Sequence, residues 1–184
     1  IVIQTILPGD TFRGAAEASY ANENTANVNG FVAGPLGDSV GAVISADYRR
    51  TDGFYRNLFL DKKVVDDLEA WNVDGRLVAN LGPSTKVDAK LRYGEFRGAS
   101  INFNSSFHIP ALGGAFFENV NAHPFRYYSN IRPTNDQKTF EASLKVDQNL
   151  GAVTLSAWTL YSKIKNDLVA DGTSADFARF ISAV

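Results

Sequence analysis

Seven segments of roughly ten residues alternate between apolar and polar side chains along this chain, and this alternation limits the folds open to it. In one of them, Val40, Ile44 and Tyr48 fall on one face, and Ser45 and Asp47 fall on the other. A period of two is what a β-strand with one apolar and one polar face requires. The pattern therefore predicts an all-β fold, with strands at 12–22, 26–36, 40–50, 70–81, 86–97, 138–148 and 151–162.

The connections between these segments alternate between short and long. Short turns rich in Gly, Pro, Asp and Asn occur at 35–39, 82–85 and 147–151. Long loops occur at about 51–69 and 98–137, and only the first connection, at 22–25, departs from the alternation by being short. Membrane β-barrels have short turns on the periplasmic side and longer loops outside. The loop lengths therefore favour an antiparallel up-and-down barrel that spans a membrane.

Large aromatic rings gather at one end of the predicted apolar faces. If the strands run up and down, the rings near the long loops are those of Tyr20, Tyr48, Trp71, Tyr93, Phe140 and Tyr161. The middle of the same faces carries Val, Ile, Leu, Ala and Gly. Such a girdle is typical of a membrane interface, where an amphipathic ring sits at the level of the lipid headgroups. We interpret the six residues as membrane-interface aromatics and expect outer-membrane lipid to cover the apolar faces.

A soluble β-sandwich is the competing interpretation, because its apolar faces would meet in a shared core. The many Ala and Gly residues on the apolar faces count against it, since a protein core of this composition packs poorly whereas fluid lipid fills gaps. The alternation is also imperfect, because Phe31, Trp158 and Leu160 fall on the polar side of their segments.

The composition of the 184-residue chain excludes several classes of function. A net charge of −2 gives no bulk attraction to nucleic acid, so no nucleic-acid partner is expected. The absence of Cys excludes a disulfide framework and a thiolate metal site. No Gly-x-Ser-x-Gly elbow, catalytic triad context or phosphate loop is present, so we expect neither an enzyme nor a bound cofactor. The first residue is not Met and no signal peptide follows, which predicts a processed or truncated N-terminus.

Four short motifs occur in order over the first 57 residues. They are the apolar run IVIQT at 1–5 with Pro8 after it, FRG at 12–14, GPL at 34–36, and RRTDGFYRN at 49–57. In this order and spacing they resemble the junction of plug and barrel in TonB-dependent outer-membrane receptors. The segment SAWTLYSKIKND at 156–167 is similar to later barrel strands of such receptors from sphingomonad-type bacteria. The resemblance covers nearly the whole chain and is firmest up to about residue 97.

The resemblance implies two parts, the end of a plug domain at 1–11 and the N-terminal part of the barrel domain at 12–184. It implies a transmembrane barrel of about 22 strands, of which this chain holds about seven. Seven strands cannot close a membrane barrel, because an open edge in lipid leaves backbone groups unpaired. We therefore expect the plug body, the TonB box and the remaining strands to lie outside this chain.

The function implied by the resemblance is import of a scarce nutrient, such as a ferric siderophore, across the outer membrane of a Gram-negative bacterium. TonB would supply the energy through a segment absent from this chain. A passive porin-like channel and a soluble β-sandwich binding module remain as alternatives. Residues 1–11 distinguish the first two, because they would lie inside the barrel of a receptor but would form a barrel strand in a porin.

The long loop at 98–137 carries the candidate residues for binding a small-molecule substrate. Aromatic and Arg side chains in an outer loop can stack on a ligand or clamp it. The alternative is a loop that packs its own aromatics and leaves Arg126 solvated. Two His residues without a third ligand do not predict a metal site. The ligand-binding candidates are His108, His123, Arg126, Tyr127 and Tyr128.

The polar faces of the predicted strands carry charges of both signs. These charges could guide a substrate, or they could pair with each other and with the plug. The mixture of signs favours pairing and argues against a simple cation or anion pore. The residues concerned are Arg13, Glu17, Asp47, Arg49, Asp74, Arg76, Lys90 and Arg92.

Overall fold

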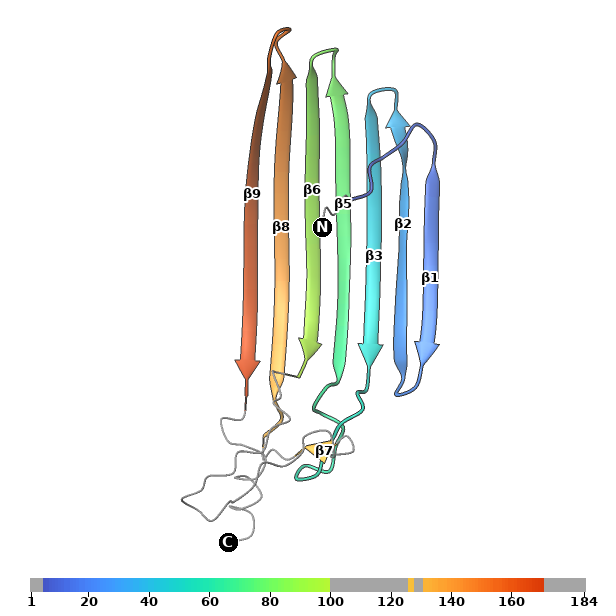
Figure 1. Cartoon of the computed structure of the whole chain (residues 1–184), viewed down its shortest axis with the longest axis vertical. Coiled ribbons are helices and arrows are strands. Elements are labelled where there is room, and N and C mark those ends of the chain that lie inside the picture. The colour runs from blue at the N-terminus through green and yellow to red at the C-terminus, as the bar shows by residue number, and fades with distance from the viewer. Residues whose placement is uncertain (1–4, 100–125, 128–130, 171–184) are drawn as a thin grey trace.

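The computed structural model describes residues 5–99, 126–127 and 131–170, and one antiparallel sheet of seven strands accounts for most of them (Figure 1). The strands of this sheet lie side by side in chain order. They are β1 (Arg13–Ala21), β2 (Thr25–Gly37), β3 (Val40–Thr51), β5 (Leu68–Leu81), β6 (Thr85–Gly98), β8 (Thr134–Asn149) and β9 (Thr154–Val169). The all-β prediction and the number of antiparallel strands are confirmed. In the described part of the chain, no helix long and apolar enough to cross a membrane is found.

Two further strands, β4 (Arg56–Asn57) and β7 (Arg126–Tyr127), form a small parallel pair outside the main sheet. They join segments that are about 70 residues apart, and neither has the alternation that marks a longer strand. Alternation along the sequence therefore does not predict them.

The turns alternate between the two ends of the sheet. The turns from β2 to β3, from β5 to β6 and from β8 to β9 lie at one end, which we call the short-turn end (Figure 1). The ends of β3 and β6, where the longer connections begin, lie at the opposite end, the long-loop end, together with the turn from β1 to β2. The predicted sorting of short and long connections is therefore confirmed.

The turn between β1 and β2 is a tight hairpin turn. Glu23 and Asn24 both have positive φ, at 60° and 50°, and the Thr25 amide donates to the Asn22 carbonyl over 3.2 Å. Two successive left-handed residues define a type I′ turn, whose twist matches that of the flanking strands. Asn is common in this conformation but Glu is not. Contacts of Glu23 with a distant loop, described below, help to hold it there.

The two faces of the sheet differ in chemistry. Because directly paired residues share a face, the rows of the sheet show which side chains lie together. One such row contains Val32, Ile44, Gly75, Leu91 and Ala142. We call this face the apolar face and the opposite one, which carries Asp74, Arg76 and Arg92, the polar face.

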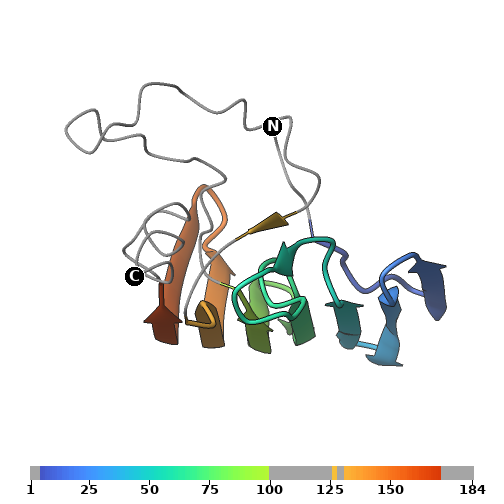
Figure 2. The same ribbon diagram turned by 90° about the horizontal axis from the view of Figure 1, so that it is seen from below.

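Neither a second long-stranded sheet nor a helix covers the apolar face within the described residues, and the seven strands form a single layer (Figure 2). Ile44 is 63% exposed and Leu91 is 53% exposed on it. Among the described residues, the buried Ala and Val side chains are few, and they are Ala33, Val43, Val64, Val65 and Ala79. The sheet is therefore not built around a core shared with another layer in the described part of the chain.

The last two long strands extend further than predicted. Strand β9 runs to Val169 instead of ending at 162, and β8 begins at Thr134 instead of at 138. Beyond Tyr161 the positions on the apolar face are Lys163, Lys165 and Asp167, so the alternation ends although backbone pairing continues. The predicted start of the last strand at 151 was also wrong, because Gly151 lies in the turn with φ of 92°.

Candidate functional site

The N-terminal segment lies across the polar face and belongs to no strand of the sheet. Arg76 on β5 donates from Nη1 to the Thr5 hydroxyl over 2.8 Å and to the Ile6 carbonyl over 3.1 Å. Arg13 at the start of β1 donates to the Leu7 carbonyl over 2.8 Å. In Figure 1 this segment crosses several strands before it enters β1, and Figure 2 shows it on one side of the sheet.

A glycine lets this segment approach the sheet closely. A side chain at Gly41 on β3 would bring its Cβ to 2.6 Å from the Cβ of Pro8. Of the predicted plug end, residues 5–8 therefore pack on the polar face, and none of the described residues 5–11 belongs to a strand of the sheet.

A groove of about 560 Å³ opens between this segment and strands β3, β5, β6, β8 and β9. Its lining is mixed in charge, since three cations and two carboxylates face it. The charged residues are Asp74, Arg76, Lys90, Arg92 and Glu141. Such a lining can bind a polar partner that offers both donors and acceptors, including backbone carbonyls of the kind that Arg76 already binds.

Ion pairs neutralise most of the charges around the groove. Arg76 donates from Nε and Nη2 to the two carboxylate oxygens of Asp88, at 2.9 and 2.5 Å. Both side chains are largely buried, with 14% and 16% exposed. Arg92 lies between Asp74, at 3.5 Å, and Glu141, at 4.0 Å. The pairing expected from the mixture of signs is therefore present for Asp74, Arg76 and Arg92.

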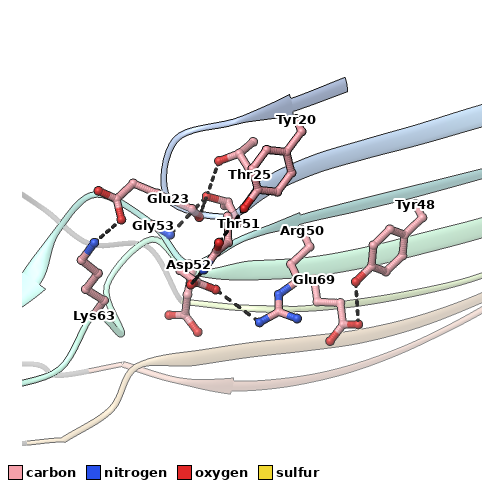
Figure 3. A network of polar contacts seen from close by, with 12 residues as sticks. Tyr20, Glu23, Thr25, Tyr48, Arg50, Thr51, Asp52, Gly53, Lys63 and Glu69 are labelled. Atoms are coloured by element: carbon pink, nitrogen blue, oxygen red, sulfur yellow. Dashed lines mark hydrogen bonds and ion pairs between the residues drawn. The ribbon is translucent and has the colours of Figure 1, made fainter. Parts of the chain in front are cut away.

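A second polar network joins the turn from β1 to β2 with the loop after β3, at the long-loop end (Figure 3). Lys63 in that loop forms an ion pair with Glu23 in the turn, and the Asp52 amide donates to the Glu23 carbonyl over 2.9 Å. The hydroxyls of Thr25 and Thr51 lie 2.8 Å apart. The loop is thus attached to the hairpin through both backbone and side chains.

Asp52 is the centre of this network. It accepts a hydrogen bond from Asn24 over 2.6 Å and one from Arg50 over 3.4 Å, and Asn24 also accepts one from the Tyr20 hydroxyl over 2.7 Å. The hydrogen bond from Asn24 is the main cause that lowers the pKa of Asp52, against a smaller effect of desolvation, and Arg50 and Lys63 lower it further. The ionised carboxylate is therefore the form that holds the loop.

Asp66 shapes the start of the same loop. Its two carboxylate oxygens accept hydrogen bonds from the backbone amides of Phe54 and Tyr55, each at 2.9 Å. Gly53 has a φ of 79° and approaches the Asp66 carboxylate so closely that a side chain would collide with it. In the sequence, Asp52 and Gly53 are part of the motif at 49–57, and no local pattern predicts that Asp66 folds back on them.

The six predicted interface aromatics all lie on the apolar face. Tyr48 and Trp71 are directly paired, and Trp71 packs against Tyr93 with a distance of 5.4 Å between ring centroids. Phe140 and Tyr161 are 6.1 Å apart by the same measure. We call Tyr20, Tyr48, Trp71, Tyr93, Phe140 and Tyr161 the aromatic line.

The aromatic line is oblique to the rows of paired residues. The row of directly paired residues that begins at Tyr20 on β1 ends at Asp167 on β9. The aromatic residue of β9 is instead Tyr161, which lies six residues nearer the short-turn end. Phe140 and Tyr161 were expected near the ends of their strands. They lie well inside them, because β8 and β9 extend beyond the predicted bounds.

The predicted ligand-binding residues are placed only in part. His108, His123 and Tyr128 lie outside the described residues. Arg126 and Tyr127 form β7, whose backbone pairs with Arg56 and Asn57 in the loop after β3. Their assignment to ligand binding stays a prediction.

Neither a protein-family model nor a curated protein matches this sequence.

Proposed function

We propose that this chain forms part of a transmembrane β-barrel in the outer membrane of a Gram-negative bacterium. We further propose that the barrel is that of a TonB-dependent receptor, which imports a scarce nutrient such as a ferric siderophore. The single observation that carries the membrane assignment is the oblique course of the aromatic line on an uncovered apolar face.

The slope of the aromatic line agrees with the tilt of strands in a membrane barrel. Over the six steps from β1 to β9 the line moves six residues along the strands, or one residue for each strand. With about 3.3 Å per residue and about 4.8 Å between strands, this offset corresponds to a tilt of about 35°. Strands of membrane barrels tilt by roughly 35–45°. If the rings mark one plane, the strands cross that plane at the angle that a barrel requires.

The height of the apolar face agrees with the same proposal. On β5 the uncharged positions of this face run from Trp71 to Leu81, and Glu69 is the next residue beyond the ring. Ten residues of a strand tilted by about 35° rise by about 27 Å. The outward apolar band of a membrane barrel is about 25 Å tall.

The position of the N-terminal segment favours a receptor over a porin. In a receptor, the chain leaves a plug inside the barrel and then enters the first strand. Residues 5–8 lie on the polar face, which would face the lumen, and Arg13 and Arg76 hold them there. In a porin the same residues would be expected in a strand of the sheet. A soluble sandwich is disfavoured because nothing in the described part of the chain covers the apolar face.

In this proposal the substrate binds at the long-loop end, where His108, His123, Arg126, Tyr127 and Tyr128 are the candidates. TonB would then act on a segment that is not in this sequence.

The two tryptophans of the chain provide the test of membrane insertion. Trp71 is on the apolar face and Trp158 is on the polar face, so each is the control for the other. The protein would be reconstituted in phosphatidylcholine vesicles with brominated acyl chains, which quench tryptophans that contact lipid. Quenching should be retained in Trp158→Phe and should fall in Trp71→Phe. Equal quenching in both variants, or none in either, would contradict the barrel.

Transport is tested by growth. A strain that lacks the gene should lose growth on one iron or carbon source, and a strain that lacks TonB should lose the same growth. Growth that requires the gene but not TonB would instead favour the passive channel.

A further inference from the structure

Three lysines gather on the apolar face of β8 and β9, immediately beyond the aromatic line. Lys138 on β8 is directly paired with Lys165 on β9, and Lys163 is directly paired with Phe140. Lys163 and Lys165 follow Tyr161 on the same face of β9. Like charges placed directly opposite each other across a sheet are destabilising unless something neutralises them. We call Lys138, Lys163 and Lys165 the lysine cluster.

The protein neutralises only one member of this cluster within its described part. Lys138 pairs with Glu95 at 3.2 Å, and Glu95 is shared with Arg97, also at 3.2 Å. No ion pair of Lys163 or Lys165 occurs among the described residues, in which β9 is the edge strand of the sheet. The nearest carboxylates on this face of the two strands, Asp136 and Asp167, are paired with each other beyond the lysines, so the two ammonium groups lie between these carboxylates and the apolar part of the face. An outside anion can reach them there.

Neighbouring strands differ from this arrangement. At the matching position on β3, just beyond Tyr48, Arg50 pairs with Asp52 at 3.4 Å. On β5 the matching residue is Glu69, which accepts a hydrogen bond from the Tyr48 hydroxyl over 3.1 Å. On this face of β8 and β9 three lysines stand against two carboxylates, Asp136 and Asp167, so a small excess of positive charge is local to these strands.

We propose that the lysine cluster binds the phosphate of an anionic membrane lipid. This inference rests on the proposed function, because it takes the aromatic line as the level of the headgroups. Alternate residues of a strand are about 6.6 Å apart, so Lys163 and Lys165 can reach one phosphate from two sides. An ammonium group is a compact charge with three donors, which suits phosphate oxygens. The acyl chains of the same lipid would lie along the apolar face, over Leu144 and Tyr161.

The experiment compares two lipids with the same acyl chains, phosphatidic acid and phosphatidylcholine. Each is titrated into the detergent-solubilised protein and its binding is followed by native mass spectrometry. The test variant is Lys163→Gln with Lys165→Gln. The control is Lys86→Gln with Lys90→Gln, which removes two charges from the polar face of β6.

Phosphatidic acid should bind the test variant roughly 25-fold more weakly, at about fivefold for each lysine, and should bind the control variant as it binds the wild type. Phosphatidylcholine should bind all three alike. An equal loss in test and control variants, or no loss in either, would overturn the proposal. Displacement of phosphatidic acid by an equal concentration of inorganic phosphate would overturn it too, because the site would then be one for a free anion.

Quenching of Trp71 by brominated lipid, measured on the same variants, separates the two proposals. If Trp71 is quenched but the lysine substitutions do not weaken the binding of phosphatidic acid, the lipid-phosphate site is rejected and the proposed barrel is retained. Loss of quenching in the wild type rejects both.

Discussion

Arg76 and Asp88 form a two-hydrogen-bond ion pair between β5 and β6, and the same guanidinium holds the N-terminal segment. Replacing Arg76 by Ala should lower the free energy of unfolding by about 2–3 kcal/mol, because the largely buried Asp88 carboxylate loses its partner. The double variant Arg76→Ala with Asp88→Ala should lose less than the two single losses added together. Urea unfolding in detergent micelles, followed by tryptophan fluorescence, measures both.

Arg97 offers the matched control for this prediction. Its side chain is 63% exposed, and its partner Glu95 keeps a second ion pair, with Lys138 at 3.2 Å, when Arg97 is removed. Arg97→Ala should therefore change the free energy of unfolding by no more than about 0.5 kcal/mol. Equal decreases in the free energy of unfolding for Arg76→Ala and Arg97→Ala would contradict the prediction that the ion pair with Asp88 stabilises the fold more than the pair with Glu95.

Three glycines should respond differently to replacement by Ala. Gly37→Ala should be nearly neutral, because no atom lies near the added methyl group and φ is not positive. Gly82→Ala should cost about 1 kcal/mol, because φ is 75° although the space is open. Gly53→Ala should cost more, about 2–4 kcal/mol, because it combines a φ of 79° with a collision with Asp66. A different order of unfolding free energies would contradict the loop geometry.

Acid should weaken the attachment of the loop after β3. The pKa of Asp52 is lowered in the folded protein by Asn24 and Arg50, so its ionised form favours folding. That contribution is complete above the ordinary pKa of 3.8 and is lost as the pH falls through the lowered value. The stability difference between the wild type and Asp52→Asn should therefore be constant at neutral pH and should shrink below about pH 4. Urea unfolding across this range measures it, and a difference that grows in acid would be the opposite result.

The depth of the aromatic line is also testable. Trp71 should be quenched more by lipids brominated near the headgroup than by lipids brominated near the ends of the acyl chains. In the variant Trp71→Phe with Leu77→Trp, the ring moves six residues toward the short-turn end on the same face. It then lies near the bilayer centre, about 16 Å deeper, and the preference should reverse. An unchanged preference would mean that the line does not mark an interface.

The strands could be predicted because the alternation of apolar and polar residues is visible within the sequence of each strand. Val40, Ile44 and Tyr48 identify β3 without any knowledge of its partners, and the structure places β3 at Val40–Thr51. The signal fails where the apolar face itself becomes polar. Strand β9 continues through Lys163 and Lys165 only because its backbone pairs with β8, and no local pattern reports that pairing.

The candidate site was less predictable, because its contacts join distant parts of the chain. Nothing near Thr5 indicates that Arg76 binds it, and nothing near Glu23 indicates the ion pair with Lys63. The mixture of charges on the polar face predicted that Arg92 would find carboxylates, but not that it would lie between Asp74 and Glu141. Side chains from separate strands meet only once the register is fixed.

The oblique course of the rings also constrains how such a sheet can close. In a closed barrel, a row of paired residues that is followed once around returns to the first strand at a different residue. The number of residues between the start and the return is the shear number. With a displacement of one residue for each strand, that number is close to the number of strands, whatever the circumference. In the proposed barrel, a strand that pairs with β9 should therefore keep the same slope, with its ring about one residue further along.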